Sequence, residues 1–385
     1  MIAPLERARD VVCVVAARHA DAVDADGRFP SEAIAALKDS RLMGVFVPRE
    51  LGGEGATVSQ LASICHLLGR ACGSTGLIYA MHLIQTACIV LHGQENAWQR
   101  DVLRQVAAEQ LLLASATTEG ATGGDLGRSE CAILVEGSGF TLEKHGAVIS
   151  YGDHADMILA TARRSADAAA SDQVLAVVPR RQFSLTQTAN WDALGMRGTC
   201  SNTYSLRAHG HVDQILPAAY GDIQNDTMTP FAHLTWSCVW LGIAVDALSR
   251  ARRYLRSHPT RTLAQGRLVD ANMKLQQMRA DIVGALRLYE VVPGTNRTGS
   301  LALLMVMNNL KISVSSGVVE VIHQALMVCG ISGYRNDSPY STGRHLRDAL
   351  SAMLMVSNDR IAAGMGKMLL VQRVDSDLLA DGEQP

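Results

Sequence analysis

Thr117-Thr118-Glu119-Gly120-Ala121-Thr122-Gly123-Gly124-Asp125 is the stretch of the sequence that decides the fold. It follows an apolar run, residues 111–116, that predicts a short buried strand leading into a loop. Glycine has no Cβ atom, so the backbone of such a loop can approach a flat or phosphorylated ligand closely. Threonine hydroxyls and successive backbone N–H groups supply hydrogen bonds to the edge of that ligand. Because the same residue types also form ordinary turns, the loop gains meaning only from the segments around it.

Composition and charge limit the classes of protein to consider. The 385 residues are 48% hydrophobic and 19% charged, which predicts a globular protein of two or three domains with a large core. The formal net charge is −2 and the basic residues are scattered, so we expect no nucleic-acid partner. The first residues lack a signal-peptide pattern, and the apolar runs are interrupted too often to span a bilayer. We therefore expect a cytoplasmic protein with no membrane partner.

Eight cysteines are widely spaced along the chain, without a C-x-x-C pair or a histidine at metal-ligand spacing. Most of them lie in apolar runs, where a free cysteine behaves as a small core hydrophobe. The pattern predicts no metal site and fits a reducing compartment.

The periodicity of apolar residues changes twice along the chain, and it predicts three domains. Residues 1–111 favour amphipathic and buried helices, including one that starts with Ser31 as its N-cap and two within residues 61–91. Residues 112–216 hold strand-length runs separated by Gly, Asp and Asn turns, typical of a small sandwich or barrel. Residues 217–385 return to long helical segments, including 263–289 and 301–328, which predict an antiparallel bundle. The fold class is therefore α+β, with a central β domain between two helical domains.

Four motifs in this order resemble those of the acyl-CoA dehydrogenase superfamily of flavoproteins, over nearly the whole chain. The first is residues 44–53, Gly-Val-Phe-Val-Pro-Arg-Glu-Leu-Gly-Gly, predicted to be an extended segment closed by a turn. The second is the loop at residues 118–125, similar to the family's T-E-P-G-A-G-S-D. The third and fourth are residues 194–199, similar to L-G-M-R-G-T, and residues 330–334 followed by Arg347-Asp348-Ala349.

The resemblance implies FAD bound between the β domain and the C-terminal bundle, in a homotetramer built as a dimer of dimers. Thr117 and Thr118 would contact the flavin ring, because fixed donors stabilise the negative charge of a reduced flavin. Gly123 and Gly124 would let the loop pass close to the substrate or the pyrophosphate. The family's W-[IV]-[ST] strand corresponds to residues 148–150, with Val148 in place of the aromatic residue. Its flavin contacts would be Ile149 and Ser150. Arg256, in a poorly matching R-x-T-F stretch, would reach the FAD of a neighbouring subunit, and Asn358 joins the predicted flavin contacts.

The chain departs from the family at the catalytic base. Acyl-CoA dehydrogenases remove an α-proton with a glutamate while hydride passes to the flavin, and this requires a carboxylate at the α-carbon. Counting from Arg347 places Val356 where the glutamate is expected, and residues 353–360 contain no glutamate. Other members carry the base on an early helix of the C-terminal domain, where His233 is this chain's only candidate. Gly124 also replaces the loop serine that lies near the thioester.

A second branch of the family resembles this chain in other respects. Flavin-dependent monooxygenases and N-hydroxylases use O2 and reduced flavin supplied by a partner reductase, and they need a sealed pocket with a proton donor. Several carry a histidine at the position of His82, and some have a His-Asp pair where this chain has Asn358-Asp359. Asp359 is therefore a candidate proton donor or displaced base, and a simple ion pair with Arg347 or Arg360 is the alternative.

Three hypotheses follow from the sequence. The first is an FAD-dependent oxidoreductase that oxidises the α,β bond of an acyl thioester carried by CoA or a carrier protein, supported by Glu119 and residues 194–199. The second is the reduced-flavin-dependent monooxygenase or N-hydroxylase, supported by the missing glutamate, Val148, Gly124 and His82. The third is a protein that binds flavin or partners without catalysis. The candidate catalytic residues are His82, His233 and Asp359.

Overall fold

The protein is described by a computed structural model that covers residues 3–121, 123, 125–261, 264–291 and 301–370. The N-terminal part is helical, as predicted. Its helices are α1 Pro4–Arg7, α2 Cys13–Asp26, α3 Ser31–Asp39, α4 Val58–Ala71, α5 Gly73–His92 and α6 Ala97–Glu109. Gly73–His92 is apolar on every side, and it is buried along most of its length as the central helix of this part.

Two local predictions in this part are wrong. Pro30 caps α3, and Ser31 is the first helical residue, so its hydroxyl contacts the Glu32 carboxylate instead of a backbone N–H. Residues 44–53 form turns and a short 3-10 helix, Arg49–Leu51, because the Gly44 carbonyl accepts the Val47 N–H and the Pro48 carbonyl accepts the Leu51 N–H within the same segment. Both segments are fixed by local hydrogen bonds, which apolar periodicity does not report.

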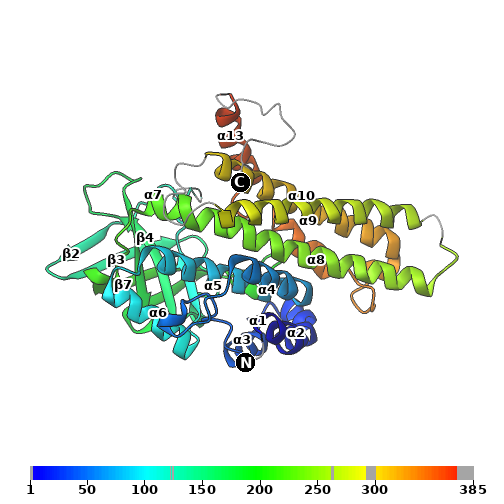
Figure 1. The fold of residues 1–385 in the computed structure, drawn as a ribbon, viewed down its shortest axis with the longest axis horizontal. Helices are drawn as coiled ribbons and strands as arrows, with labels where there is room; N and C mark the ends of the chain where they lie inside the picture. Colours follow the sequence, from blue (N-terminus) through cyan, green and yellow to red (C-terminus); the bar gives the residue numbers. More distant parts are fainter. Residues whose placement is uncertain (1–2, 122, 124, 262–263, 292–300, 371–385) are drawn as a thin grey trace.

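The central part contains two small sheets (Figure 1). One has the order β1-β4-β5, in which β1 is parallel to β4 and β5 is antiparallel to it; the other is antiparallel, with the order β2-β3-β7-β6. The strands are β1 Leu113–Ala116, β2 Ile133–Glu136, β3 Gly139–Gly146, β4 Met157–Arg163, β5 Gln173–Pro179, β6 Phe183–Ala189 and β7 Thr203–His211. β4 and β5 are almost wholly buried, whereas β3 alternates buried and exposed residues.

The C-terminal part is a helical bundle that extends away from the sheets (Figure 1). The long helices α8, α9 and α10 pack on one another, and α4 packs on α8. A Cβ atom on Gly242 of α8 would lie 2.3 Å from the His66 carbonyl oxygen of α4, so this pair of helices approaches closely only because glycine stands there. The helices are α7 Tyr220–Ile223, α8 Thr229–Ser257, α9 Ala264–Val291, α10 Leu301–Cys329, α11 Ile331–Tyr334, α12 Gly343–Leu350 and α13 Asn358–Leu369.

Short 3-10 and π-helical turns connect these elements: π turns Ala8–Val12 and Gln224–Met228, and 3-10 turns Gly152–His154, Arg180–Gln182, Arg197–Thr199 and Val212–Gln214. The observed architecture confirms the predicted α+β class.

Three helical segments of the described chain have the length and hydropathy of a membrane span: α5, residues 220–257 and residues 302–329. The prediction that every apolar run is too interrupted is therefore wrong by length and composition. In the first two, 89% and 83% of the most apolar window is buried inside the protein, as in central core helices; in the third the share is 50%. The lack of a membrane partner stays a prediction.

Residues 194–199 pack directly against α12. A Cβ atom on Gly195 would lie 2.1 Å from the Arg347 carbonyl oxygen and 2.6 Å from the Asp348 backbone nitrogen. We expect Gly195→Ala to lower the free energy of unfolding by about 3 kcal/mol or more, because backbone atoms must move to admit the methyl group. Urea denaturation followed by circular dichroism measures this change.

Gly284→Ala is the matched control, since Gly284 is an exposed residue in the middle of α9 where an added Cβ atom would have no neighbour within 4 Å. We expect this variant to be more stable than the wild type by about 0.5–1 kcal/mol. A Gly195→Ala protein as stable as the wild type would contradict the close packing.

Candidate functional site

The 117–125 loop starts from a strand that two buried side chains hold in place. His82 of α5 accepts the Leu113 N–H at Nδ1 (3.1 Å), and the Tyr151 hydroxyl donates to the Leu113 carbonyl (2.9 Å). Beyond β1 the loop runs beside the end of β3, where the Thr118 carbonyl accepts the Ala147 N–H. The start and the direction of the loop are therefore set by α5 and by the segment that follows β3.

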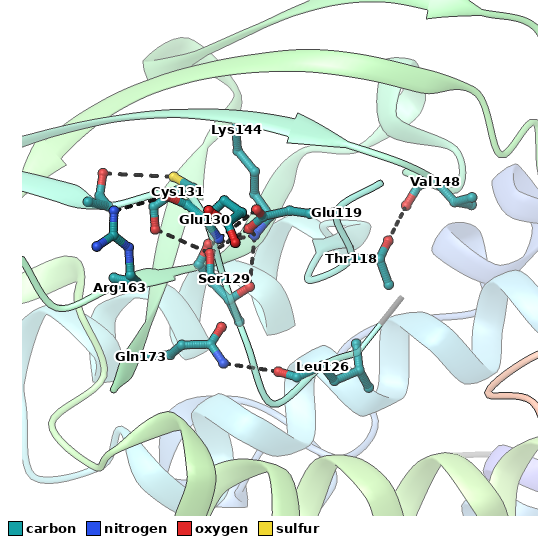
Figure 2. Close-up of polar contacts among 12 residues, drawn as sticks. Thr118, Glu119, Leu126, Ser129, Glu130, Cys131, Lys144, Val148, Arg163 and Gln173 are labelled. Carbon is teal, nitrogen blue, oxygen red and sulfur yellow. Dashed lines mark hydrogen bonds and ion pairs between the residues drawn. The ribbon is translucent and has the colours of Figure 1, made fainter. Parts of the chain in front are cut away.

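A buried ion pair between Glu119 and Lys144 holds the loop on the side that faces the interior of the β domain (Figure 2). The Lys144 ammonium lies 2.6 Å from Glu119 Oε1 and donates to the backbone and side-chain oxygens of Thr161. Glu119 Oε2 accepts the Glu130 N–H at 2.8 Å, and the Ser129 hydroxyl donates to Oε1. The only carboxylate among residues 117–124 thus serves the interior of the β domain, which leaves it no role as a base at the surface of the loop.

Burial and pairing act in opposite directions on the pKa values of these two groups. Burial raises the pKa of Glu119, but the hydrogen bonds from Lys144 and Ser129 outweigh it and leave the pKa below its usual value. Burial lowers the pKa of Lys144, and the Glu119 carboxylate offsets part of that change. At neutral pH the two groups form an ion pair.

The outer side of the loop is open. Gly120 and Gly123 are exposed, and a Cβ atom on either would have no neighbour within 4 Å. Thr118, which is half-buried, donates its hydroxyl to the Val148 carbonyl at 3.3 Å, and the Val148 side chain is 41% exposed. Thr122 and Gly124 lie outside the described residues.

A row of hydroxyl groups continues from residues 148–150, which follow β3 as a loop and not as the predicted strand. Ser150 Oγ lies 2.8 Å from Ser201 Oγ, which lies 2.7 Å from Thr199 Oγ1. Ile149 and Thr117 are buried, so side-chain contact with a ligand in this region falls to Thr118 and Ser150.

The bundle meets the β domain through α12 and α13. Asp348 Oδ1 accepts the Met196 N–H at 2.6 Å, and Arg360 of α13 donates to the Gly123 carbonyl at 2.6 Å. Burial raises the pKa of Asp348 to about 6. Between these two contacts lies the 351–357 turn, which contains the Val356 position expected for the family's glutamate. Its residues are Ser, Ala, Met, Leu, Met, Val and Ser, so the turn contains no carboxylate.

The structure does not gather the three candidate catalytic residues at this surface. His82 is fully buried, and its Nε2 lies 2.8 Å from the Met43 carbonyl oxygen, so both ring nitrogens have backbone partners. His233 is buried in α8 with Nδ1 3.1 Å from the Met307 carbonyl oxygen. Burial lowers the pKa of His82 to about 4 and that of His233 to about 3, so both are neutral at pH 7. This placement favours structural roles for both histidines.

Asp359 is exposed in the first turn of α13, and no ion pair among the described residues includes it. Arg347 pairs with Asp24, and Arg360 binds the Gly123 carbonyl, so the alternative ion pair with either arginine is not formed. The catalytic role of Asp359 stays a prediction.

Two predicted flavin contacts lie elsewhere. Asn358 faces the bundle, where Oδ1 accepts from Lys311 and Nδ2 donates to Ser315. Arg256 is exposed at the far end of α8, a 29-residue helix about 43 Å long whose start lies near the β domain. Arg256 and the loop therefore lie far apart within one chain, a position that suits contact only with a neighbouring subunit.

Sequence reasoning missed Lys144, Lys311, Ser201 and the role of Asp348. The burial of Lys144 could have been predicted from the sequence. Lys144 follows Phe140 and Leu142 at alternate positions of β3, so its side chain points into the core like theirs. Lys311 is the only lysine in the apolar run 301–329. The partner Met196 of Asp348 and the partner Ser150 of Ser201 come from segments distant in sequence, which no local pattern reports.

Models of the acyl-CoA dehydrogenase N-terminal and C-terminal domains match residues 3–110 and 226–364. The chain is 25% identical over 361 residues to a probable acyl-CoA dehydrogenase of Bacillus subtilis, YngJ, covering 89% of this chain and 90% of that protein. Two solved structures share the fold. FMN-bound TdsC from Paenibacillus sp. A11-2 has a TM-score of 0.83 at 20% identity and covers 97% of this chain and 98% of its own. Butyryl-CoA dehydrogenase from Megasphaera elsdenii has a TM-score of 0.82 at 18% identity, covering 95% and 97%.

The chain belongs to the acyl-CoA dehydrogenase family, and it is accordingly a flavin-dependent oxidoreductase. The site fits a flavin: Gly120 and Gly123 leave open space for a ring or phosphate, and the hydroxyls of Thr118 and Ser150 line the adjoining surface. Both a dehydrogenase and TdsC share the fold to a similar degree, so the reaction depends on the side chains at the site.

The Glu119–Lys144 pair yields the first prediction for the site. We expect Glu119→Gln to lower the free energy of unfolding by about 3–5 kcal/mol, because it leaves the buried ammonium without its carboxylate. The amount of flavin that stays bound during gel filtration should also fall, because the ion pair holds the loop in place. Urea denaturation at pH 7 and the absorbance of the retained flavin measure the two effects.

Glu143→Gln is the matched control, because Glu143 lies on β3 next to Lys144 but pairs with Arg207 at the surface. The Glu143 and Arg207 side chains are 51% and 72% exposed. Its effect should stay below about 0.5 kcal/mol. Equal losses in the two variants would show that the buried pair has no special role.

The buried histidines yield a pH dependence of stability. The pKa of His82 is lowered from 6.5 to about 4 in the folded protein, so the unfolded chain binds more protons between these values. We expect the free energy of unfolding to fall as the pH drops from 6.5 to 4, with His82 contributing about 3 kcal/mol. His82→Gln should remove that share of the slope in urea denaturation, whereas substitution of the exposed His209 by Gln should leave the slope intact. A His82→Gln protein with the wild-type slope would refute the assignment.

Proposed function

We propose that this protein is a flavin-dependent monooxygenase that acts with O2 and with reduced flavin supplied by a partner reductase. The observation that carries the proposal is the 351–357 turn, which contains no carboxylate at the position expected for the family's base and lies between Asp348, bound to Met196, and Arg360, bound to Gly123 of the flavin loop. His233, the other candidate base, is buried and bound to a backbone carbonyl. Removal of an α-proton requires a base at the substrate, whereas oxygen transfer from a reduced flavin does not.

The residues of the site have separate tasks in this proposal. A bound reduced flavin supplies the two electrons that activate O2. Thr118 and Ser150 orient the ring by hydrogen bonding, and the open positions at Gly120 and Gly123 admit the ring or its phosphate.

Assembly and location complete the proposal. The cytoplasm, which contains reduced flavin and reductases, is the compartment that suits this activity. We propose a homo-oligomer, either a dimer or the tetramer usual in the family, because Arg256 lies at the far end of α8 and can serve a flavin only from a neighbouring subunit. FAD is the flavin expected from the family, and FMN is the one named in the TdsC structure. Chromatography of the flavin released from the purified protein identifies which one is bound.

Dehydrogenation of an acyl thioester, on CoA or a carrier protein, is the second candidate function. Its support is the similarity to YngJ over 89% of the chain. The structure offers no carboxylate in the 351–357 turn for this chemistry, and the exposed Asp359 lies just beyond it.

Rapid mixing separates the two functions. We expect the oxidised, flavin-loaded protein to keep its visible absorption band when mixed without oxygen with acyl-CoA and acyl-carrier thioesters of varied length. We expect the reduced protein to show a transient absorbing species on mixing with O2, before oxidised flavin returns. Bleaching by any thioester would overturn the monooxygenase proposal.

Asp359→Asn supplies the matched variant for this experiment. Because Asp359 is exposed and has no ion-pair partner among the described residues, we expect the variant to react with O2 at the wild-type rate. A rate lowered about tenfold or more, with flavin binding retained, would instead assign the proton transfer to Asp359.

A further inference from the structure

Lys311 is a buried lysine on α10 whose hydrogen-bond partners, Val356 and Asn358, lie just before Arg360, the residue that contacts the flavin loop. Its ammonium donates to the Val356 carbonyl at 2.9 Å and to Asn358 Oδ1 at 2.6 Å. Asn358 Nδ2 in turn donates to Ser315 Oγ at 3.0 Å, one helical turn along α10. One face of α10 therefore holds the end of the 351–357 turn by two side chains.

The ammonium group lies in the interior with neutral acceptors. Burial lowers the pKa of Lys311 from 10.5 to about 8, and no carboxylate among the described residues offsets this change. His233 of α8 is the titratable group that faces Lys311, and it is neutral because burial, together with Lys311, lowers its pKa to about 3. Burying a charged ammonium group costs desolvation free energy, and charge-assisted hydrogen bonds offset that cost.

Several charged groups on α10 and on the elements packed against it have partners of their own. Their contacts are Lys274 with Glu320, Asp281 with Ser313, His345 with Asp246, Arg344 with Asp21, Arg347 with Asp24, Asp348 with the Met196 N–H, and Arg360 with the Gly123 carbonyl. Asp359 is exposed.

The turn held by Lys311 has a backbone that needs support. Val356 has φ of +45°, a left-handed conformation that a β-branched residue rarely adopts. The segment is also fixed at both sides to the β domain, by Asp348 at Met196 and by Arg360 at Gly123. Lys311 is thus the contact from the bundle between two contacts to the β domain.

We propose that Lys311 is a positioning residue of the flavin site: through Val356 and Asn358, its ammonium holds the end of the 351–357 turn, next to the contact between Arg360 and the flavin loop. The inference rests on the proposed flavin site, but it does not depend on which reaction the site catalyses. Loss of this contact frees the strained turn and opens the site to water.

The proposal has an unusual pH signature. As the pH rises through about 8, Lys311 loses its proton and the charge-assisted contacts to the turn weaken, so flavin affinity should fall. Global stability should respond in the opposite direction to this group. Because the pKa of Lys311 is lower in the folded protein than in the unfolded chain, its deprotonation raises the free energy of unfolding between pH 8 and 10.5.

The experiment compares the full-length wild type with Lys311→Met, Lys311→Arg and the control Lys367→Met, an exposed lysine on α13. Flavin affinity is measured by fluorescence titration from pH 6.5 to 9.5. We expect about tenfold weaker binding by the wild type at high pH, uniformly weak binding by Lys311→Met, and binding by Lys311→Arg that stays tight throughout. The control should follow the wild type.

Limited proteolysis of the flavin-free proteins tests the turn itself. Leu354 is 79% exposed, so a protease that cleaves at leucine reports how often the turn opens. We expect cleavage at residues 351–357 to be about tenfold faster in Lys311→Met at pH 7, and to accelerate above pH 8 in the wild type only. This measurement decides the proposal even if the protein binds no flavin.

The proposal would be overturned if Lys311→Met bound flavin with the wild-type affinity and were cleaved at residues 351–357 at the wild-type rate. It would also be overturned if Lys311→Arg still lost flavin affinity as the pH rose. If circular dichroism shows that Lys311→Met does not fold, Asn358→Asp replaces it: a carboxylate beside the ammonium raises the pKa of Lys311, so the loss should move to higher pH. An unchanged midpoint would overturn the proposal. A normal pH signature without a reaction with O2 would instead refute the monooxygenase function and leave the role of Lys311 intact.

Discussion

The carboxylate of Asp348 is the contact on which the arrangement of the three parts of the chain depends. It lies on α12, accepts the Met196 N–H of the β domain, and would touch a Cβ atom placed on Gly73 at the start of α5 (2.8 Å). One buried acid therefore joins the C-terminal bundle, the central sheets and the N-terminal helices. Gly195 packs on the backbone beside it, and this close approach fixes how residues 194–199 meet α12.

The site inherits its shape from that junction. Because Asp348 of α12 binds Met196 and Arg360 of α13 binds the Gly123 carbonyl, the turn between them is held between two contacts to the β domain. The two buried lysines then act from opposite sides: Lys144 holds the loop through Glu119, and Lys311 holds the turn through Val356 and Asn358. The chain has the family's fold, but residues 351–357 contain no carboxylate for dehydrogenation, and Lys311 binds the end of this turn.

Several features were predictable because they depend on local pattern. The all-round apolar run of α5, the continuous apolar strands β4 and β5, and the long helices α9 and α10 are visible as periodicity. Residues 44–53 and 148–150 were mispredicted as extended, because their backbone bonds go to turns and to Asn202 of a distant segment. His82 and His233 were candidate catalytic residues because the sequence does not show which groups contact a histidine in an apolar helix. In the folded protein these groups are backbone carbonyls of distant residues.

The sequence by itself determined the family, the α+β fold class and the absence of a glutamate at the usual position, and it predicted the division into domains and the flavin loop. These follow from residue identity and spacing along the chain. Only the tertiary structure decided that Glu119 faces the interior, that both candidate histidines are neutral and enclosed, and that Lys311 supports the turn. The physical reason is that burial and hydrogen-bond partners set the charge and accessibility of each group, and those partners come from residues far apart in sequence.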